Sequence, residues 1–284
     1  MTAEPGLVVV DKPGGMTSHD VVSRVRRLAE TRKVGHSGTL DPMATGVLVL
    51  AVNRATRLLG HLILTDKRYD ATIRLGATTM TDDAEGEIVE SRSTADVTAE
   101  AVRTALAAFV GATDQIPSSV SAIKVDGKRA YARVRDGEQV DLPVRRVTVH
   151  SLEVTGLDLP EVRISVHCSS GTYIRAIARD LGAALGVGGH LTALRRTAVG
   201  PFTLDQARTL DQLTECFSLT PVAAAARATF PARELDGEQA AHVRVGRALD
   251  VTLEETTALF APDGEFLALY EPRDGDARAV AVFV

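Results

Sequence analysis

The chain has only two cysteines in 284 residues, Cys168 and Cys216, and they stand far apart. Such a pair fits neither a disulfide framework nor the ligand spacing of a zinc site. Histidine pairs with metal-binding spacing are also missing from the sequence, so we expect no bound metal. An apolar run of about 18 residues, which a membrane-spanning helix requires, is missing as well, so we expect no membrane partner.

Residues 1–16 lack the long apolar stretch of a secretory signal, and they carry Glu4, Asp11 and Pro13. We therefore expect a cytoplasmic protein whose thiols stay reduced. Hydrophobic residues make up 45% of the chain and charged residues 24%, a composition that fits one large or two modest globular domains.

Several common signatures of catalysis are missing too. No glycine-rich loop ends in Gly-Lys-Ser or Gly-Lys-Thr, which excludes phosphate binding by a P-loop. No Gly-x-Ser-x-Gly motif is present, which excludes the serine nucleophile of an α/β-hydrolase. The segments around Asp11 and Asp41 lack the second aspartate with which aspartate-based phosphatases hold magnesium, so that reading fails as well.

The net charge of −5 conceals an uneven distribution. Residues 205–284 hold seven arginines against 14 acidic residues, whereas the first 204 residues are almost neutral. Within that neutral part, basic residues gather at 24–36 and at 124–146. Two basic patches on a nearly neutral body can follow a phosphate backbone. The residues of these patches that we expect to contact a nucleic acid are Arg24, Arg26, Arg27, Lys128 and Arg129.

Strand-like and helical segments alternate irregularly along the chain. Periodicity predicts strands at 7–13, 46–52, 68–76, 144–157 and 162–170, of which 46–52 would be buried on both faces. Helical spacing predicts helices after Ser18, which would cap the first one, at 98–111 and at 173–186. Because several strands follow one another directly, we expect an α+β fold with a mixed, mainly antiparallel sheet, flanking helices and a central cleft.

The composition also divides the chain. Residues 112–146 are polar, basic and punctuated by glycine, which predicts an excursion from the core whose basic residues can contact a nucleic acid. After about residue 205, an alanine-rich helical stretch gives way to short strand-like runs around tight turns. We therefore expect a first domain at 1–204 and a small acidic module at 205–284, helical and then β.

One short segment, VGHSGTLDPMATGVL at residues 34–48, contains the most informative carboxylate. Asp41 lies there among Gly35, Gly38 and Gly46, directly before a buried strand. Glycines let a backbone approach another group closely, whereas Asp-Pro by itself is commonly a local turn device. The residues alone leave both a structural and a catalytic interpretation of Asp41 open.

This segment resembles the signature of the TruB-type tRNA pseudouridine-55 synthases. Five further blocks of that family occur in the same order: VVVDKPGGMTSHDVV, DKRYDATIRLG, VSAIKVDGKRAYARVR, CSSGTYIRAIARDLG and LTALRRTAVGPF. Together the blocks cover residues 7 to about 204. One departure is IPSSVSAIK, where the family more often has a second proline and a tyrosine. The resemblance implies that the chain ends in a small β module of the PUA kind or a variant of it.

The resemblance implies an isomerase that converts uridine 55 in the T-loop of tRNA to pseudouridine after flipping the base out of its stack. Asp41 would be the catalytic carboxylate, attacking either C6 of the base or C1′ of the ribose. Tyr69 would stack on the base and assist proton removal, and Arg175 would keep Asp41 charged and aimed. The other implied residues are Tyr173, Leu194 and His36 at the base, and Lys12 and Lys124 for phosphate binding or positioning.

Two kinds of function are compatible with this resemblance. One is the enzyme, and the other is an RNA chaperone that clamps the T-arm of tRNA and helps it fold without chemistry. A pure chaperone has no need of Asp41, Tyr69 and Arg175 together, so we favour the enzyme, with or without a folding role. No metal or organic cofactor is implied, and we expect a monomer. Without the resemblance, these tyrosines and Leu194 would be read as core residues, and Arg175 and His36 as surface residues.

Overall fold

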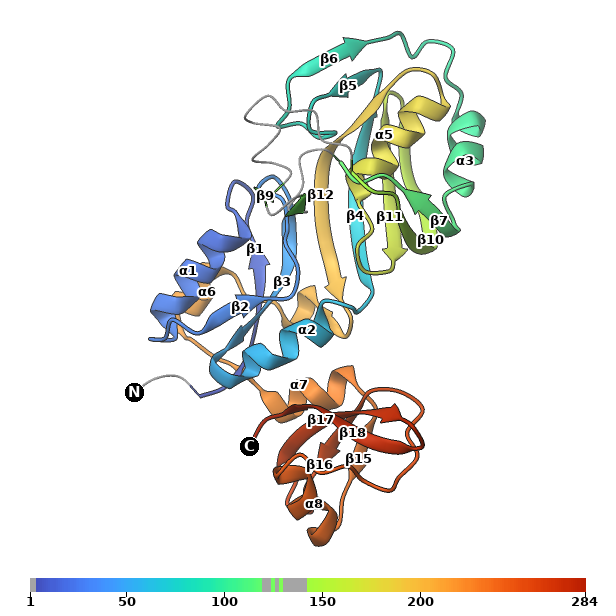
Figure 1. The fold of residues 1–284 in the computed structure, drawn as a ribbon. Coiled ribbons are helices and arrows are strands. Elements are labelled where there is room, and N and C mark those ends of the chain that lie inside the picture. Colours follow the sequence, from blue (N-terminus) through green and yellow to red (C-terminus); the bar gives the residue numbers. More distant parts are fainter. Residues whose placement is uncertain (1–3, 119–123, 126–127, 130–141) are drawn as a thin grey trace.

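The structure is a computed structural model that describes residues 4–118, 124–125, 128–129 and 142–284 (Figure 1). A ten-stranded sheet dominates the fold. The strands along it are β14 (Thr220–Pro221), β1 (Gly6–Lys12), β3 (Thr45–Val52), β12 (Gly189–Val199), β4 (Lys67–Leu75), β11 (Glu161–Cys168), β10 (Arg145–Asp158) and β7 (Gly111–Gln115). Two further strands pair off this path, β2 (Val34–His36) with β3 and β13 (Phe202–Thr203) with β12. The expected α+β architecture is confirmed.

Most strand pairs of this sheet are antiparallel, as predicted. The β3–β12 pair is parallel, and its register contains only Arg195 opposite Thr45 and Arg196 opposite Gly46. This short contact joins two parts of the sheet. One part contains β14, β1, β2 and β3, and the other runs from β12 through β4, β11 and β10 to β7 (Figure 1).

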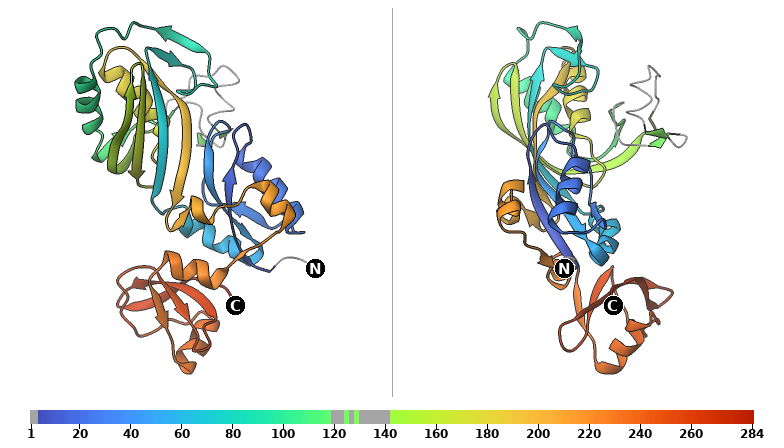
Figure 2. Two further views of the ribbon diagram at one scale, coloured as in Figure 1. Left: turned by 180° about the vertical axis from the view of Figure 1, so that it is seen from behind. Right: turned by 90° about the vertical axis from the view of Figure 1, so that its left-hand side faces the viewer.

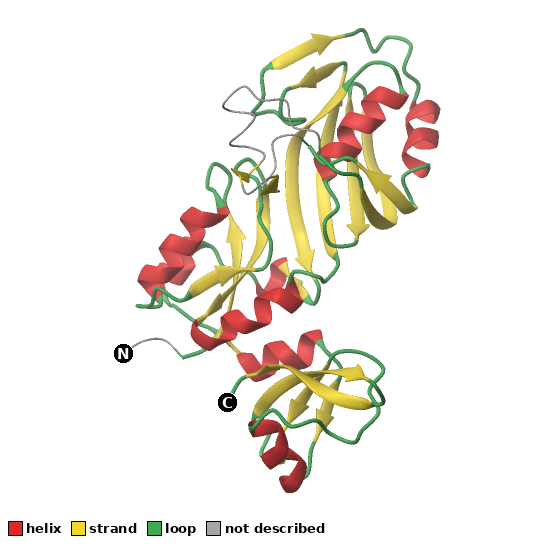
Figure 3. Ribbon diagram, in the orientation of Figure 1, coloured by secondary structure: helices red, strands yellow, loops and turns green. Residues whose placement is uncertain are grey.

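Helices cover the sheet unevenly (Figure 3). The helices α1 (Ser18–Leu28) and α6 (Leu210–Glu215) pack on the β1–β3 part, whereas α3 (Ala99–Ala107) and α5 (Ile174–Ala184) pack on the other part. The opposite face of β1 and β3 is covered by a 3-10 helix (Asn53–Leu58), α2 (Leu59–Leu62) and α7 (Val222–Thr229). Strand β3 is therefore buried on both faces, which explains its unbroken apolar sequence.

Strand β4 shows the expected alternation. Its buried side chains include Tyr69, Ala71, Ile73 and Leu75, and Arg68, Asp70 and Arg74 between them are exposed. Helix α5 packs on the same side as the buried set. The period of two in the sequence thus reports that only one face of β4 is covered by protein.

The start of α1 differs from the prediction. Thr17, not Ser18, is the N-cap: its hydroxyl accepts a hydrogen bond from the Asp20 N–H, and the Asp20 carboxylate accepts one from the Thr17 N–H at 2.9 Å. Ser18 is buried, and its hydroxyl bonds both the carbonyl and the N–H of Leu40, at 3.1 and 2.9 Å. The serine therefore ties the first turn of α1 to the loop before Asp41.

Residues 230–284 form a second, smaller sheet with its own apolar core. Its strands are β15 (Ala232–Glu234), β16 (Thr257–Phe260), β17 (Phe266–Arg273) and β18 (Asp276–Val282), accompanied by α8 (Gly237–Arg244). This sheet lies at one end of the molecule, next to α7 (Figures 1 and 2). Because α6 and β14 pack on the large sheet, we propose that the small module begins near residue 230 and not at 205.

The expected insertion at 112–146 is shorter in the structure. Gly111–Gln115 form β7 and Arg145–Asp158 form β10, so both ends of the segment belong to the large sheet. Between them, β8 (Lys124–Val125) pairs with β9 (Lys128–Arg129). The side chains of Lys124, Lys128 and Arg129 lie outside what the structure describes. A separate hairpin, β5 (Ala77–Thr79) with β6 (Ile88–Ser91), follows β4.

None of the helices in the described part of the chain has the length and apolar character needed to span a membrane.

The β3–β12 contact requires glycine at position 46. Gly46 has a φ of +100°, and a Cβ atom there would lie 2.2 Å from the carbonyl oxygen of Arg196. We expect Gly46→Ala to lower the free energy of unfolding by at least about 2 kcal/mol, because strain and overpacking add. Gly264→Ala is the matched control, since Gly264 has a φ of +85° and open space around it. It should cost about 1 kcal/mol.

Because the chain has no tryptophan, circular dichroism is the suitable probe of urea unfolding. If both variants lost the same free energy of unfolding, the close contact between Gly46 and β12 would add nothing to the cost of the left-handed backbone.

Candidate active site

A pocket of about 330 Å³ lies beside the paired strands β4 and β12. The loop that contains Asp41, the walls of β4 and β12, and the start of α5 surround it. Five residues selected from the sequence line this pocket together: Asp41, Tyr69, Tyr173, Arg175 and Leu194. They come from segments that are far apart in the sequence, so the fold gathers them into one site.

Asp41 stands in the loop between β2 and β3. The Asp41 carbonyl accepts a hydrogen bond from the Ala44 N–H at 3.1 Å, which closes a tight turn. Leu40, one residue earlier, is held by the hydroxyl of Ser18. The Asp41 side chain remains 32% exposed, so the carboxylate faces the pocket although its backbone is fixed.

Arg175 lies in the first turn of α5 and pairs with Asp41. Its Nε atom is 3.0 Å from Asp41 Oδ2, and its Nη2 atom donates to Asp41 Oδ1 at 3.3 Å. The guanidinium side chain is only 5% exposed, so this two-point contact is shielded from water. The expected Asp41–Arg175 contact is therefore present.

Asp83 is a second carboxylate at this site that the sequence analysis missed. Its Oδ2 atom lies 3.4 Å from Arg175 Nη1, which also donates to the Thr81 carbonyl at 2.8 Å. Asp83 is buried, and its other oxygen accepts from the Thr81 hydroxyl. Arg175 is thus held from both sides, by Asp41 at the pocket and by Asp83 behind it. Only a single DDAEGE run marked this acidic loop in the sequence.

The charge of Asp41 depends on its surroundings. Burial in the pocket wall raises the pKa of Asp41 above its ordinary value, and Asp83 raises it further, whereas Arg175 and Lys12 lower it. Removing Arg175 would therefore favour the protonated carboxyl. The guanidinium favours the charged form of Asp41 in a site that disfavours charge.

Tyr69 and Leu194 form neighbouring parts of the pocket wall. They lie on the paired strands β4 and β12, and they are 7% and 8% exposed. Burial raises the pKa of the Tyr69 phenol, so its hydroxyl stays protonated at neutral pH. The pair offers a flat aromatic ring and an aliphatic side chain to a bound group.

Tyr173 precedes α5 as its N-cap residue. The amide side chain of Gln115 on β7 binds its backbone twice, donating to the Tyr173 carbonyl at 3.0 Å and accepting from the Tyr173 N–H at 2.7 Å. Gln115 is itself buried. These two hydrogen bonds fix the backbone where the chain enters α5, and they therefore fix the direction of Arg175.

Arg196 is a second residue that the sequence analysis missed. Its side chain is almost fully buried, and it donates to three carbonyl oxygens. These are the carbonyls of Val47 at 2.7 Å, Gly38 at 3.2 Å and Thr39 at 3.3 Å. Because Gly38 and Thr39 belong to the Asp41 loop, Arg196 anchors that loop to β12. Its place in the LTALRRTAVGPF block was its only sequence signal.

The side chain of Lys12 lies inside the protein. It is fully buried, and its Nζ atom donates to the carbonyls of Met16 at 2.7 Å, Pro13 at 2.8 Å and Pro42 at 3.1 Å. Burial lowers its pKa to about 8. Of the two expected roles of Lys12, these contacts favour positioning over phosphate binding, because Pro42 adjoins Asp41.

Two further expectations lie away from the pocket wall. His36 is not among the described residues that line the pocket; it sits on β2, where its Nδ1 atom accepts from the Gly38 N–H at 3.3 Å. Arg26 and Arg27 are exposed on α1, and Arg24 is half-buried beside them. Arg24 and Arg27 line a second pocket, whereas Arg26 donates to the Val34 carbonyl at 3.3 Å. Arg145, which lines the pocket itself, adds another exposed positive charge.

Comparison with known proteins agrees with this geometry. Residues 26–174 match the TruB family pseudouridylate synthase (N terminal domain). Residues 175–226 match the tRNA pseudouridylate synthase B C-terminal domain, and residues 230–284 match tRNA pseudouridine synthase II, C terminal.

Similar proteins include the tRNA pseudouridine synthase B of Arthrobacter sp. (strain FB24), 57% identical over 98% of this chain and 96% of its own. The tRNA pseudouridine synthase B of Streptomyces griseus is 56% identical over 99% of this chain and 98% of its own.

Solved structures share the fold. The crystal structure of a Cbf5-Nop10-Gar1 complex matches with a TM-score of 0.76 and 26% identity, over 98% of this chain and 83% of that chain. An H/ACA RNP bound to a substrate RNA containing 2′-deoxyuridine matches with a TM-score of 0.75 and 24% identity, over 98% and 85%. The family blocks, the pocket and the relatives over the full length lead to one conclusion: the chain belongs to the TruB family of pseudouridylate synthases.

Proposed function

We propose that this protein isomerises uridine to pseudouridine at position 55, in the T-loop of tRNA. The names of its relatives support the substrate class, since those proteins are tRNA pseudouridine synthases. The observation that carries the proposal is the forked contact between Asp41 and the buried Arg175, at the wall of a pocket that Tyr69 also lines.

The reaction makes specific demands on a site. The bond between N1 of uracil and C1′ of ribose breaks, and a bond between C5 and C1′ forms. C5 loses a proton and N1 gains one, so no atom is lost and nothing is oxidised or reduced. A site for this reaction needs a nucleophile, a proton acceptor and a pocket that holds the detached base.

Asp41 supplies the nucleophile. Its carboxylate attacks either C6 of the base or C1′ of the ribose, and both attacks require the charged form. Arg175 maintains that charge and directs the two oxygens through its fork. Asp83 in turn prevents the guanidinium from rotating away, because it binds Nη1 from the far side.

Tyr69 and Leu194 hold the base. A uridine within an RNA loop must leave its stack, which costs a few kcal/mol, and stacking on an aromatic ring returns about 1–3 kcal/mol. The volume of about 330 Å³ suits one nucleoside and not a larger segment of RNA. Tyr69 lines the same pocket as Asp41, and its proposed second role is to assist the transfer of the C5 proton.

The tRNA contacts extend beyond the pocket. Arg24, Arg26 and Arg27 on α1 bind the phosphate backbone of the T-arm, and His36 contacts the RNA near the flipped nucleotide. A folding role for tRNA would use these same contacts without the carboxylate. A variant that lacks only the carboxylate therefore separates isomerisation from RNA folding.

Replacing Asp41 by asparagine should abolish isomerisation while preserving tRNA binding. The amide keeps the volume but is not a nucleophile, so we expect a rate loss of at least about 100-fold, with tRNA affinity within about tenfold. Asp70→Asn is the control, because Asp70 is an exposed carboxylate next to Tyr69 on β4. Single-turnover release of tritium from C5-labelled tRNA measures the rate, and substantial turnover by Asp41→Asn would refute the assignment.

The pH dependence of the rate should show that Arg175 controls the charge of Asp41. The carboxylate is charged only above its pKa, and that pKa is raised, so the rate should fall on acidification at a higher pH than an ordinary aspartate, about 3.9, would give. Arg175→Met removes an influence that lowers the pKa, so its acid limb should move further up and its rate should nearly vanish at neutral pH. Arg175→Lys keeps the charge without the fork and should retain part of the rate.

Both Arg175 variants should still bind tRNA, since the pair points into the pocket. Circular dichroism confirms that they fold. A pH profile of Arg175→Met that coincides with that of the wild type would leave Arg175 a structural residue only.

Binding of tRNA should weaken steeply with salt, despite the net charge of −5. Each lost phosphate contact lowers the slope of log K against log salt by about 1, so replacing Arg24, Arg26 and Arg27 by glutamine should flatten the plot. The control is Arg103→Gln, an exposed arginine on α3. If the triple variant and the control gave the same slope, the α1 face would not contact tRNA.

A further inference from the structure

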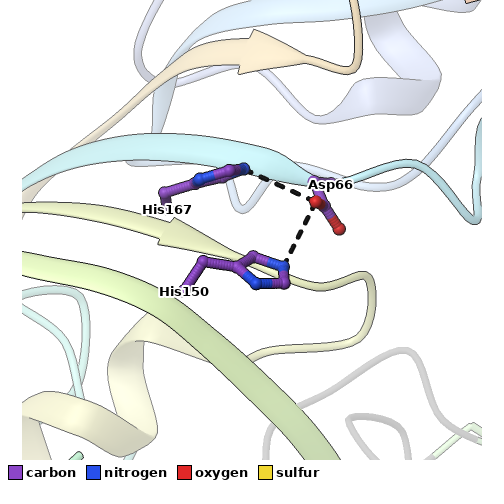
Figure 4. A group of neighbouring side chains, drawn as sticks. All are labelled: Asp66, His150 and His167. Atoms are coloured by element: carbon purple, nitrogen blue, oxygen red, sulfur yellow. Dashed lines mark ion pairs between the residues drawn. The ribbon is translucent and has the colours of Figure 1, made fainter. Parts of the chain in front are cut away.

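Three potential metal ligands converge on the face of the sheet opposite the pocket (Figure 4). They are Asp66, directly before β4, His150 on β10 and His167 on β11. Their neighbours in sequence, Lys67 and Cys168, are buried: Lys67 lines the pocket, and Cys168 belongs to the core that contains Tyr69. Because side chains alternate along a strand, Asp66 and His167 point the other way.

The distances between the donor atoms fit a tetrahedral metal. Asp66 Oδ2 lies 3.2 Å from His150 Nε2 and 3.5 Å from His167 Nε2, and all three donor atoms lie within 4.8 Å of one another. Zinc bonds to imidazole nitrogen and carboxylate oxygen are about 2.0–2.2 Å long, so two ligands at a tetrahedral angle lie roughly 3.3–3.5 Å apart. The two distances from Asp66 Oδ2 to the histidine nitrogens are close to this spacing.

The backbone preorganises the three ligands. A β-bulge sets both His150 and Ser151 opposite His167, and the two imidazole rings lie 4.7 Å apart. The Asp66 carbonyl accepts a hydrogen bond from the Gly200 N–H at 2.8 Å, which fixes the start of β4. Little reorganisation is therefore needed to bring the ligands to a metal ion.

The chemistry of the cluster selects a cation. A carboxylate between two imidazoles repels phosphate, so an anion site is disfavoured. Calcium and magnesium prefer oxygen ligands only, whereas two imidazoles and one carboxylate suit zinc. The side chains of His150 and Asp66 are 37% and 45% exposed, so a metal can enter from solvent and keep a water molecule as its fourth ligand.

We propose that Asp66, His150 and His167 bind one Zn²⁺ ion, which clips together the ends of β4, β10 and β11 behind the catalytic pocket. The ion would hold β4 three residues before Tyr69. Such a clip stabilises the wall that carries Tyr69, because it binds the folded state and not the unfolded chain. This site is independent of the isomerisation chemistry proposed above, and it departs from the expectation of no bound metal, which rested on spacing along the sequence.

The test uses the full chain without a polyhistidine tag, stripped of metal with a chelator. Isothermal titration with ZnCl₂ should give one ion per chain. Titration with CoCl₂ should give the intense visible absorption of a four-coordinate cobalt site. Zinc should also raise the melting temperature of the wild-type protein, a readout that does not involve enzyme activity.

The variants locate the ion. His167→Ala and Asp66→Asn should each lose the stoichiometric binding, the cobalt absorption and the rise in melting temperature. Two controls should keep all three: His242→Ala on α8, and Cys216→Ser, which removes the exposed thiol. Arg68→Gln should bind zinc more tightly, because Arg68 lies opposite His167 in the strand register and its charge opposes a cation.

Several results would overturn the proposal. Failure of the wild-type protein to bind one zinc ion would show that the imidazoles only donate hydrogen bonds to Asp66. Retention of binding by His167→Ala, loss of binding in a control, or an unchanged zinc affinity in Arg68→Gln would place the metal elsewhere.

Discussion

The buried guanidinium of Arg196 joins the two parts of the large sheet to the loop that contains Asp41. It donates to the carbonyls of Val47 on β3 and of Gly38 and Thr39 in the loop, while its own backbone presses against Gly46. A buried charge is tolerated only where hydrogen bonds replace its water, and here the loop carbonyls do so. The position of Asp41 therefore depends on the same contact that joins the sheet.

Arg175 is likewise a buried guanidinium whose charge is balanced by oxygen atoms around it. One guanidinium serves two carboxylates, Asp41 at the pocket and Asp83 behind it. Burial raises the pKa of Asp41 and Asp83 raises it further, so the charged form of this carboxylate depends on Arg175, which lowers the pKa. Asp83 fixes the direction of Arg175, but its negative charge also raises the pKa of Asp41. Lys12 contributes a further positive charge from within the protein, where it binds three carbonyls.

Much of this molecule was predictable from local patterns. The alternation in β4, the unbroken apolar run of β3 and the helical spacing of α1 and α5 each report which faces are covered, and each prediction is confirmed. Asp41, Tyr69, Tyr173, Arg175 and Leu194 were selected through family blocks, and the structure places them around one pocket. Their catalytic roles stay predictions. The cap of α1 was wrong by one residue, because the hydroxyl of Ser18 bonds Leu40 instead of the helix.

By itself, then, the sequence determined the fold class, the main elements and the family, because periodicity and contiguous blocks are properties of neighbouring residues. Beyond the Asp41–Arg175 pair that the resemblance implied, the tertiary structure alone decided which distant residues meet. Asp83 behind Arg175, the burial of Lys12, the loop contacts of Arg196 and the Asp66–His150–His167 cluster all depend on strand register and bulges. Register is set by pairing between segments far apart in the chain, and spacing along the sequence carries no record of it.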